Sequence, residues 1–203
     1  MNVVQEFKIN KNDSFKIVVP NIEDKYNYFY EPTEQLHVFD QVTVLLQQND
    51  TSIEIAKDAM DTIVVDFEFT LEKILSEKNN LPERCGVGDL GRIYNVGVNA
   101  DSDDEFDITQ FSVWSNPKSS TWIYRKNNQI YLEISPKYPW LYEDSEPSEE
   151  YITLQDFMST YKLIALYEID TKTIYQWLAQ CGKIIENTAT PLGYEYYKDN
   201  AGN

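Results

Sequence analysis

The sequence predicts an α+β fold: an antiparallel sheet of about five to seven strands, with two or three helices packed mainly on one face. Two patterns carry this prediction. Segment 111–140 alternates apolar and polar residues on both sides of Asn127-Asn128, and asparagine tolerates the positive φ angles of a two-residue hairpin turn. Segment 170–185 repeats apolar residues every three or four positions, which is typical of an amphipathic helix.

The predicted hairpin has two chemically different faces, because successive side chains of a strand point to opposite sides. Its register pairs Lys126 with Gln129 and Trp122 with Glu133. One face carries Ile123, Arg125, Ile130, Leu132 and Ile134, and the other carries Trp122, Tyr124, Tyr131 and Glu133. The aromatic face is either a contact surface, since tyrosine and tryptophan are enriched in binding hot spots, or core beneath a second helix. We favour the covered core and keep Trp122, Tyr124 and Tyr131 as candidate contact residues.

The elements before the hairpin follow from short apolar patterns. Segments 3–9, 14–19, 36–47 and 111–114 are expected to be strands, and 21–33 a loop that closes at Pro32. Segment 55–75 has apolar residues at helical spacing, but Ile63 to Leu71 also alternate as a strand does, and Thr62 to Val65 are largely β-branched. Its length and the sequence LEKILSEK favour a helix throughout. Pro82 ends this segment in either case.

After the hairpin, Thr153 is the expected N-cap of a short helix and Asp170 that of a helix reaching Ile185, with a strand at 163–169 between them. We expect one domain over residues 1–187, followed by a polar, tyrosine-rich tail at 188–203. A chain of this length buries enough surface to fold without disulfides or metals. Cys85 and Cys181 match no metal or redox spacing and are expected to be buried and reduced.

The composition excludes several classes of function. No apolar run approaches the roughly 20 residues of a membrane span, and no signal-peptide pattern is visible, so a cytoplasmic protein without cofactors is expected. The formal net charge is −17, which disfavours nucleic acid and anionic membranes as direct ligands. It favours a basic protein partner, although acidity also serves solubility alone.

Two acidic runs flank the hairpin in sequence and are the candidate contact residues for such a partner. They contain Asp101, Asp103, Asp104, Glu105, Asp107, Glu143, Asp144, Glu146, Glu149 and Glu150. The alternative is two solvated loops, as charge runs usually are. The first run does not fit a calcium loop, because Phe106 and Ser112 occupy the positions that require glycine and glutamate.

No catalytic motif stands out. Gly86 to Gly91 match GxGxxG, but the predicted helix and Pro82 precede them and a β-like segment, 93–98, follows. A dinucleotide site needs a strand, a loop and a helix in that order. His37, the only histidine, lies in a predicted strand with no nucleophile motif nearby, so a structural role is expected. Carboxylate pairs suited to glycoside hydrolysis occur by chance among 34 acidic residues.

Four short segments together resemble small uncharacterised bacterial proteins of the kind that serve as immunity proteins beside polymorphic toxins. They are residues 89–95 (DLGRIYN), 121–124 (TWIY), 132–140 (LEISPKYPW) and 175–178 (YQWL), and the likeness covers about the last two-thirds of the chain. The resemblance implies a cytosolic antitoxin that binds and blocks one toxin domain, and it assigns no residue roles. The net charge of −17 favours a basic toxin domain, such as a nuclease. A carboxylate-based hydrolase on a small or sugar substrate and a cytosolic adaptor are the alternatives.

Overall fold

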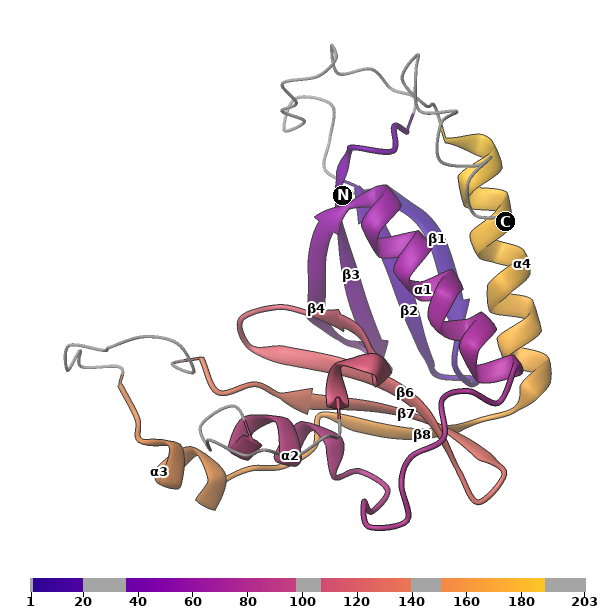
Figure 1. The fold of residues 1–203 in the computed structure, drawn as a ribbon. Coiled ribbons are helices and arrows are strands. Elements are labelled where there is room, and N and C mark those ends of the chain that lie inside the picture. Colours follow the sequence, from indigo (N-terminus) through magenta and orange to yellow (C-terminus); the bar gives the residue numbers. More distant parts are fainter. Residues whose placement is uncertain (1, 20–35, 98–106, 140–150, 189–203) are drawn as a thin grey trace.

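The computed structural model describes residues 2–19, 36–97, 107–139 and 151–188, which form two four-stranded antiparallel sheets and four α-helices (Figure 1). The first sheet has the order β1-β2-β3-β4, with β1 (Asn2–Lys8), β2 (Asp13–Val19), β3 (Gln41–Gln48) and β4 (Thr51–Ala59). The second has the order β5-β6-β7-β8, with β5 (Ser112–Ser115), β6 (Ser119–Lys126), β7 (Gln129–Pro136) and β8 (Ala165–Ile169).

The helices are divided between the sheets. Helices α1 (Met60–Leu75) and α4 (Thr171–Asn187) lie side by side over the first sheet, whereas α2 (Leu90–Gly97) lies against the second (Figure 1). Helix α3 (Leu154–Ser159) precedes β8, and a 3-10 helix, η2 (Ile108–Phe111), precedes β5. The α+β prediction is confirmed, but the strands form two sheets rather than one, because α1 and the segment after it separate the two meanders in the chain.

One apolar core joins the two sheets. It contains the inner residues of the first sheet, the apolar sides of α1 and α4, and the aliphatic face of the hairpin. Phe67 of α1 lies near its centre, with its ring centroid 5.3 Å from that of Phe7, 4.6 Å from that of Trp114 and 5.6 Å from that of Trp177. The sheets therefore share a core even though they do not share a hydrogen-bonded edge.

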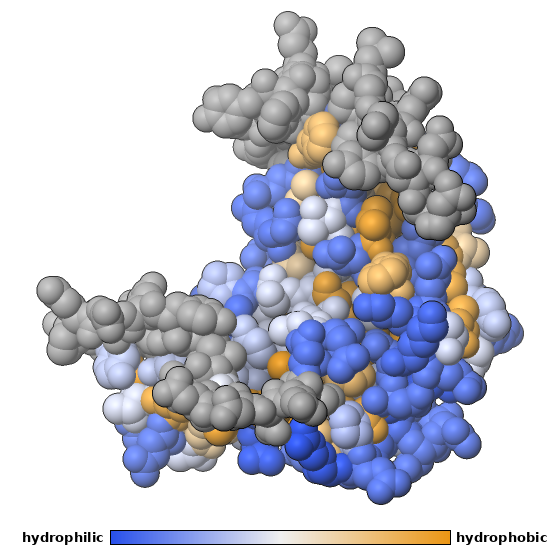
Figure 2. Space-filling view, viewed as in Figure 1, coloured by the Kyte–Doolittle hydropathy of each residue, from blue (hydrophilic) through white to orange (hydrophobic). Residues whose placement is uncertain are grey.

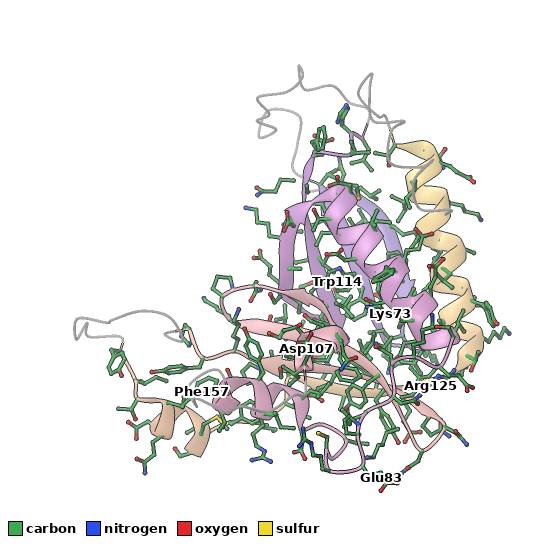
Figure 3. All side chains as sticks on the ribbon, viewed as in Figure 1. Lys73, Glu83, Asp107, Trp114, Arg125 and Phe157 are labelled. Carbon is green, nitrogen blue, oxygen red and sulfur yellow. The ribbon has the colours of Figure 1, made fainter. Side chains whose placement is uncertain are left out.

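The hairpin prediction is confirmed in register and in turn. Lys126 pairs with Gln129 and Trp122 with Glu133, and Asn127 and Asn128 have φ angles of 51° and 64°. On the aliphatic face Arg125 reaches the end of α1, where its Nε donates to the carbonyl oxygen of Ile74 at 2.7 Å (Figure 3). The guanidinium thus adds a second donor to a carbonyl of the last helical turn, which also accepts from Glu77 N at 3.3 Å.

The helix predicted over 55–75 is confirmed from Met60 onward and is wrong before it. Ile55 to Ala59 belong to β4, which pairs with β3 along its length, with a register shift between Val44 and Leu45. Helix α1 starts without a side-chain cap. Instead, the backbone N–H groups of Met60 and Asp61 donate to the carbonyl oxygens of Asp40 and Val38. Sheet pairing and a distant turn, neither visible in local periodicity, therefore set this boundary.

The later elements follow the sequence prediction closely. Thr153 Oγ1 caps α3 by accepting from Asp156 N, and Asp170 Oδ1 caps α4 by accepting from Thr173 N at 2.6 Å. Both cysteines are buried and free. The strand predicted at 36–47 begins only at Gln41, and the loop predicted at 21–33 and the tail beyond Thr188 lie outside the described residues.

Candidate functional site

Most of the acidic candidates from the sequence lie outside the part of the chain that the structure describes. This holds for Asp101, Asp103, Asp104, Glu105, Glu143, Asp144, Glu146, Glu149 and Glu150. Asp107 is described, and its exposed carboxylate caps η2 by accepting from Thr109 N at 2.9 Å. Asp107 therefore has a local structural role at the point where the first acidic run meets the second sheet.

The aromatic face of the hairpin is core. Trp122 and Tyr124 are fully buried beneath α2 and the segment that leads into it, together with Leu81, Leu90 and Phe111. The contact-surface interpretation is therefore wrong for Trp122 and Tyr124, because buried side chains offer no area to a partner. Tyr131 is partly buried and stacks on Tyr124, with ring centroids 5.9 Å apart.

Glu133 is a fully buried carboxylate on this covered face. Its Oε1 accepts from Gly91 N at 2.8 Å, and its Oε2 accepts from Leu90 N at 3.3 Å and from Tyr124 Oη at 3.0 Å. The N–H of Gly88 in turn donates to Tyr124 Oη at 2.8 Å. Glu133 thus satisfies the unpaired N–H groups of the first turn of α2, where the helix dipole also favours a negative charge.

Burial raises the pKa of Glu133, and the hydrogen bonds from Gly91, Tyr124 and Leu90 oppose this shift. Burial, followed by the negative charge of Glu133, also raises the pKa of Tyr124, so the phenol remains a hydrogen-bond donor. The network holds α2 in place at its start, and Asn95 holds the last turns through bonds to Gly91 O, Pro136 O and Tyr138 N.

This network explains two differences from the sequence analysis. Residues Ile93 to Gly97 form α2 rather than the predicted β-like segment, because Glu133 and Asn95 fix a helix there through contacts distant in sequence. A helix does follow the GxGxxG match, but no strand precedes it. Its first N–H groups are already occupied by Glu133, so they are not available to a pyrophosphate. This occupancy argues against a dinucleotide site at Gly86 to Gly91 independently of the sequence pattern.

His37 lies at the turn just before β3 rather than inside a strand, and carbonyl groups of this turn accept the first N–H groups of α1. Its backbone N–H donates to Asp40 Oδ2 at 2.9 Å, and its Nδ1 accepts from Phe39 N at 3.4 Å. Asp40 is buried, and its carbonyl oxygen receives Met60 N at the start of α1. These contacts support the structural role that the sequence analysis expects for His37.

A groove of about 420 Å³ lies where α1, β4 and the η2–β5 segment meet. Figure 3 labels two of its lining residues, Trp114 of β5 and Lys73 in the last turn of α1. The lining is mostly polar: Lys57, Asp58, Thr62, Asp66, Thr70, Lys73, Thr109, Gln110, Ser112 and Ser115, with Ala56, Ile63, Phe69, Val113 and Trp114 as the apolar residues. Its floor is fixed, because buried Trp114 donates from Nε1 to Ile63 O at 3.0 Å.

Among the described residues, neither groove carboxylate, Asp58 or Asp66, forms an ion pair. The ion pairs among the described residues are Lys8–Glu6 and Arg92–Asp89, and neither lies in the groove. Partial burial raises the pKa of Asp66, and the negative charges of Asp58 and Asp61 raise it further. Asp58 accepts only the N–H of the next residue, Ala59, in the described part of the chain. A concentration of negative charge therefore lies at the end of the groove where α1 begins.

An exposed aromatic side chain adjoins these carboxylates. Phe69 is 56% exposed, and Val65, one turn earlier on α1, is 49% exposed. Figure 2 shows hydrophobic residues among hydrophilic ones on the face that α1 and α4 present. Lys73 Nζ lies 4.2 Å from the centre of the Phe69 ring, which places a cation over the ring face. Aromatic and acidic groups thus meet at the surface of α1.

The sequence analysis missed Asp58, Asp66 and Phe69. A signal was present: apolar residues at positions 65 and 69 lie four apart, off the buried stripe of α1, between acidic residues. That signal becomes readable only when the helix is known to begin at Met60, which fixes the residues that face outward.

Comparisons of the chain with models of known protein families, with curated proteins and with solved structures found no match. Within the described ranges, no three histidine, cysteine, aspartate or glutamate side chains are grouped to hold a metal ion. No described helix has the length and apolar character needed to cross a membrane. The groove is therefore interpreted from its own geometry and charge.

Proposed function

We propose that this protein binds a basic partner protein and blocks it, as an immunity protein neutralises a toxin domain. The observation that supports this most is the groove, where Asp58 and Asp66 lack cationic partners among the described residues of a chain with a net charge of −17. A basic partner would supply the missing positive charge. A nuclease domain, which must carry positive charge to bind phosphates, is a partner of this kind.

The surface of α1 has the composition of a protein-binding site. Interfaces combine a few exposed aromatic residues with a polar surround, and most of the binding energy comes from few residues. Phe69 and Val65 offer the apolar area, and the adjacent carboxylates offer the complementary charge. Such charge speeds encounter with a basic partner and suppresses binding of acidic proteins.

The proposal is tested by purifying the tagged full-length chain from its native cell at low and high salt, followed by mass spectrometry. We expect one stoichiometric basic protein that is lost at high salt, because exposed charge pairs are screened. Expressing that protein alone should inhibit growth, and expressing this chain with it should restore growth. Recovery of the chain alone, or of a partner that is not toxic, contradicts the antitoxin function.

A second candidate is a hydrolase that uses the groove carboxylates. The raised pKa of Asp66 favours this candidate, because a carboxylic acid with a raised pKa can act as a general acid nearer neutral pH. Asp58, on the same groove, would be the second carboxylate. A panel of aryl glycosides and esters tests this: turnover by the wild type that Asp66→Asn abolishes would support the hydrolase, and no turnover would remove it.

A further inference from the structure

The groove lies between the outermost described strands of the two sheets. Strand β4 is the last strand of the first sheet and β5 the first of the second, so each has one neighbouring strand within the described residues. Ala56 to Asp58 of β4 and Ser112 to Ser115 of β5 line the groove. Edge strands present unpaired N–H and C=O groups, and an extended chain can add to them by main-chain hydrogen bonds.

A side-chain hydrogen bond links the two strands next to the groove. Asn116, after β5, donates from its Nδ2 to Glu54 O of β4 at 3.0 Å and so bridges the two edges. This bond shows that β4 presents a carbonyl oxygen toward β5 at Glu54. The lining continues along α1 from Thr62 to Lys73.

Two aspartates and two lysines line the groove. Lys57 and Asp58 are neighbours in β4, Asp66 lies on α1 with the negative charges of Asp58 and Asp61 near it, and Lys73 lies in the last turn of α1. Neither Lys57 nor Lys73 forms an ion pair with the groove carboxylates. Lys73 lies instead over the Phe69 ring, whose exposed area also suits the stem of a long basic side chain.

We infer that the groove receives an extended basic segment of the partner protein, with an arginine or lysine side chain between Asp58 and Asp66. This inference rests on the proposed function and adds to it the place where the partner makes contact. Arginine fits best, because its planar guanidinium can donate to two carboxylates and stack on an aromatic ring. The main chain of the segment runs along the edge of β5. Because β5 has four residues, it can form only a few main-chain hydrogen bonds with the segment.

The first test uses a labelled peptide of alternating arginine and serine as the probe, with a glutamate–serine peptide as its counterpart, in fluorescence polarisation with the full chain at low salt. We expect the arginine peptide to bind and Asp58→Asn with Asp66→Asn to weaken it about tenfold, which corresponds to about 1.4 kcal/mol. The matched control is Glu168→Gln with Glu186→Gln, which removes the same charge from exposed positions on β8 and α4. That control should change the affinity less than about twofold, as rim charges act mainly by long-range attraction.

Two outcomes would overturn the inference. Equal weakening by the groove pair and the control pair would show long-range attraction without a site. Amide shifts on peptide addition that fall outside residues 56–58, 62–73 and 109–115 in NMR spectra would place binding elsewhere. Circular dichroism melts of both variant pairs check that folding is unchanged.

The captured partner separates this inference from the proposed function. If the partner binds the Asp58→Asn, Asp66→Asn chain as tightly as the wild type, the groove inference fails and the antitoxin function stands. If the groove binds the arginine peptide but no toxic basic protein is captured, the antitoxin function fails and the groove remains a site for basic segments.

Discussion

Glu133 and Asp66 are two carboxylates whose pKa is raised first by burial, yet their surroundings differ completely. Glu133 is sealed beneath α2 and accepts hydrogen bonds from Gly91, Leu90 and Tyr124. The Asp66 carboxylate has access to solvent on α1, beside like charges, and accepts no hydrogen bond in the described structure; the carbonyl oxygen of Asp66 accepts one from Thr70 Oγ1. The raised pKa of Glu133 therefore accompanies a hydrogen-bonded structural contact. The raised pKa of Asp66 accompanies like charges nearby, which a positive charge would offset.

The same contrast holds for the regions around them. The aromatic face of the second sheet is closed, since α2 supplies the donors and the apolar cover. The junction of α1, β4 and β5 stays open as a groove with its carboxylates unpaired among the described residues. Four predictions test this distinction.

The largest effect is expected from removing the sealed carboxylate. Glu133→Ala leaves the N–H groups of Gly91 and Leu90 and the Tyr124 hydroxyl buried without an acceptor. We expect the free energy of unfolding in urea to fall by about 3 kcal/mol, since hydrogen bonds to charged groups contribute about 1.5–3 kcal/mol each and are not additive. Asp66→Ala should change it by less than about 0.5 kcal/mol, as is usual for exposed sites. Similar losses for both variants would contradict the distinction.

A second effect concerns the fit of α2 on the sheet. A Cβ at Gly91 would lie 2.1 Å from Ser135 Cβ and 2.6 Å from Tyr161 Oη, so Gly91→Ala must displace the helix or the strand. Overpacking of this kind costs about 1–3 kcal/mol, which a thermal melt would detect. Gly182→Ala in α4 is the matched control, because a Cβ there meets nothing within 4 Å. It should stabilise the protein by about 0.5–1 kcal/mol through helix propensity.

Glu133 and Asp66 should change the pH dependence of stability in the same direction, and the change from Glu133 should be larger. A raised pKa in the folded state means that the folded chain binds more protons, so the stabilising contribution is complete below the unfolded pKa and is lost as pH rises through the folded one. The ordinary pKa is 4.5 for glutamate and 3.8 for aspartate, so this loss of stability begins near pH 4.5 for Glu133 and near pH 3.8 for Asp66. We expect the difference in unfolding free energy between wild type and Glu133→Gln to shrink as pH rises above 4.5. The difference between wild type and Asp66→Asn should change in the same direction by a smaller amount. A difference that grows with pH would refute the assigned directions.

Phe69→Ala is expected to have the smallest effect on stability and to weaken binding of the arginine peptide instead. Phe69→Ala removes an exposed ring, so the free energy of unfolding should stay within about 0.5 kcal/mol of the wild type. Binding of the arginine peptide should weaken by a factor of about 2–5, in line with an exposed cation–π contact of about 0.5–1 kcal/mol. Tyr175→Ala on α4, an exposed aromatic outside the groove lining, should leave that binding unchanged.

The sequence alone determined the elements whose chemistry is local. Asn127-Asn128 fixed the hairpin and its register, because the turn and the alternation of side chains act within a few residues. Asp170 and the apolar stripe after it determined α4, and Thr153 determined α3. The separation of an aliphatic face from an aromatic one on the hairpin was equally readable.

Only the tertiary structure decided the rest, since it depends on partners distant in the chain. Pairing with β3 made residues 55–59 a strand despite their helical spacing, and Glu133 and Asn95 made residues 93–97 a helix despite their β-like pattern. Among 34 acidic residues, burial and hydrogen bonding alone distinguish Glu133, which completes the fold, from Asp58 and Asp66, which face an open groove. Free energies of desolvation and pairing are set by surroundings, and the folded chain creates those surroundings.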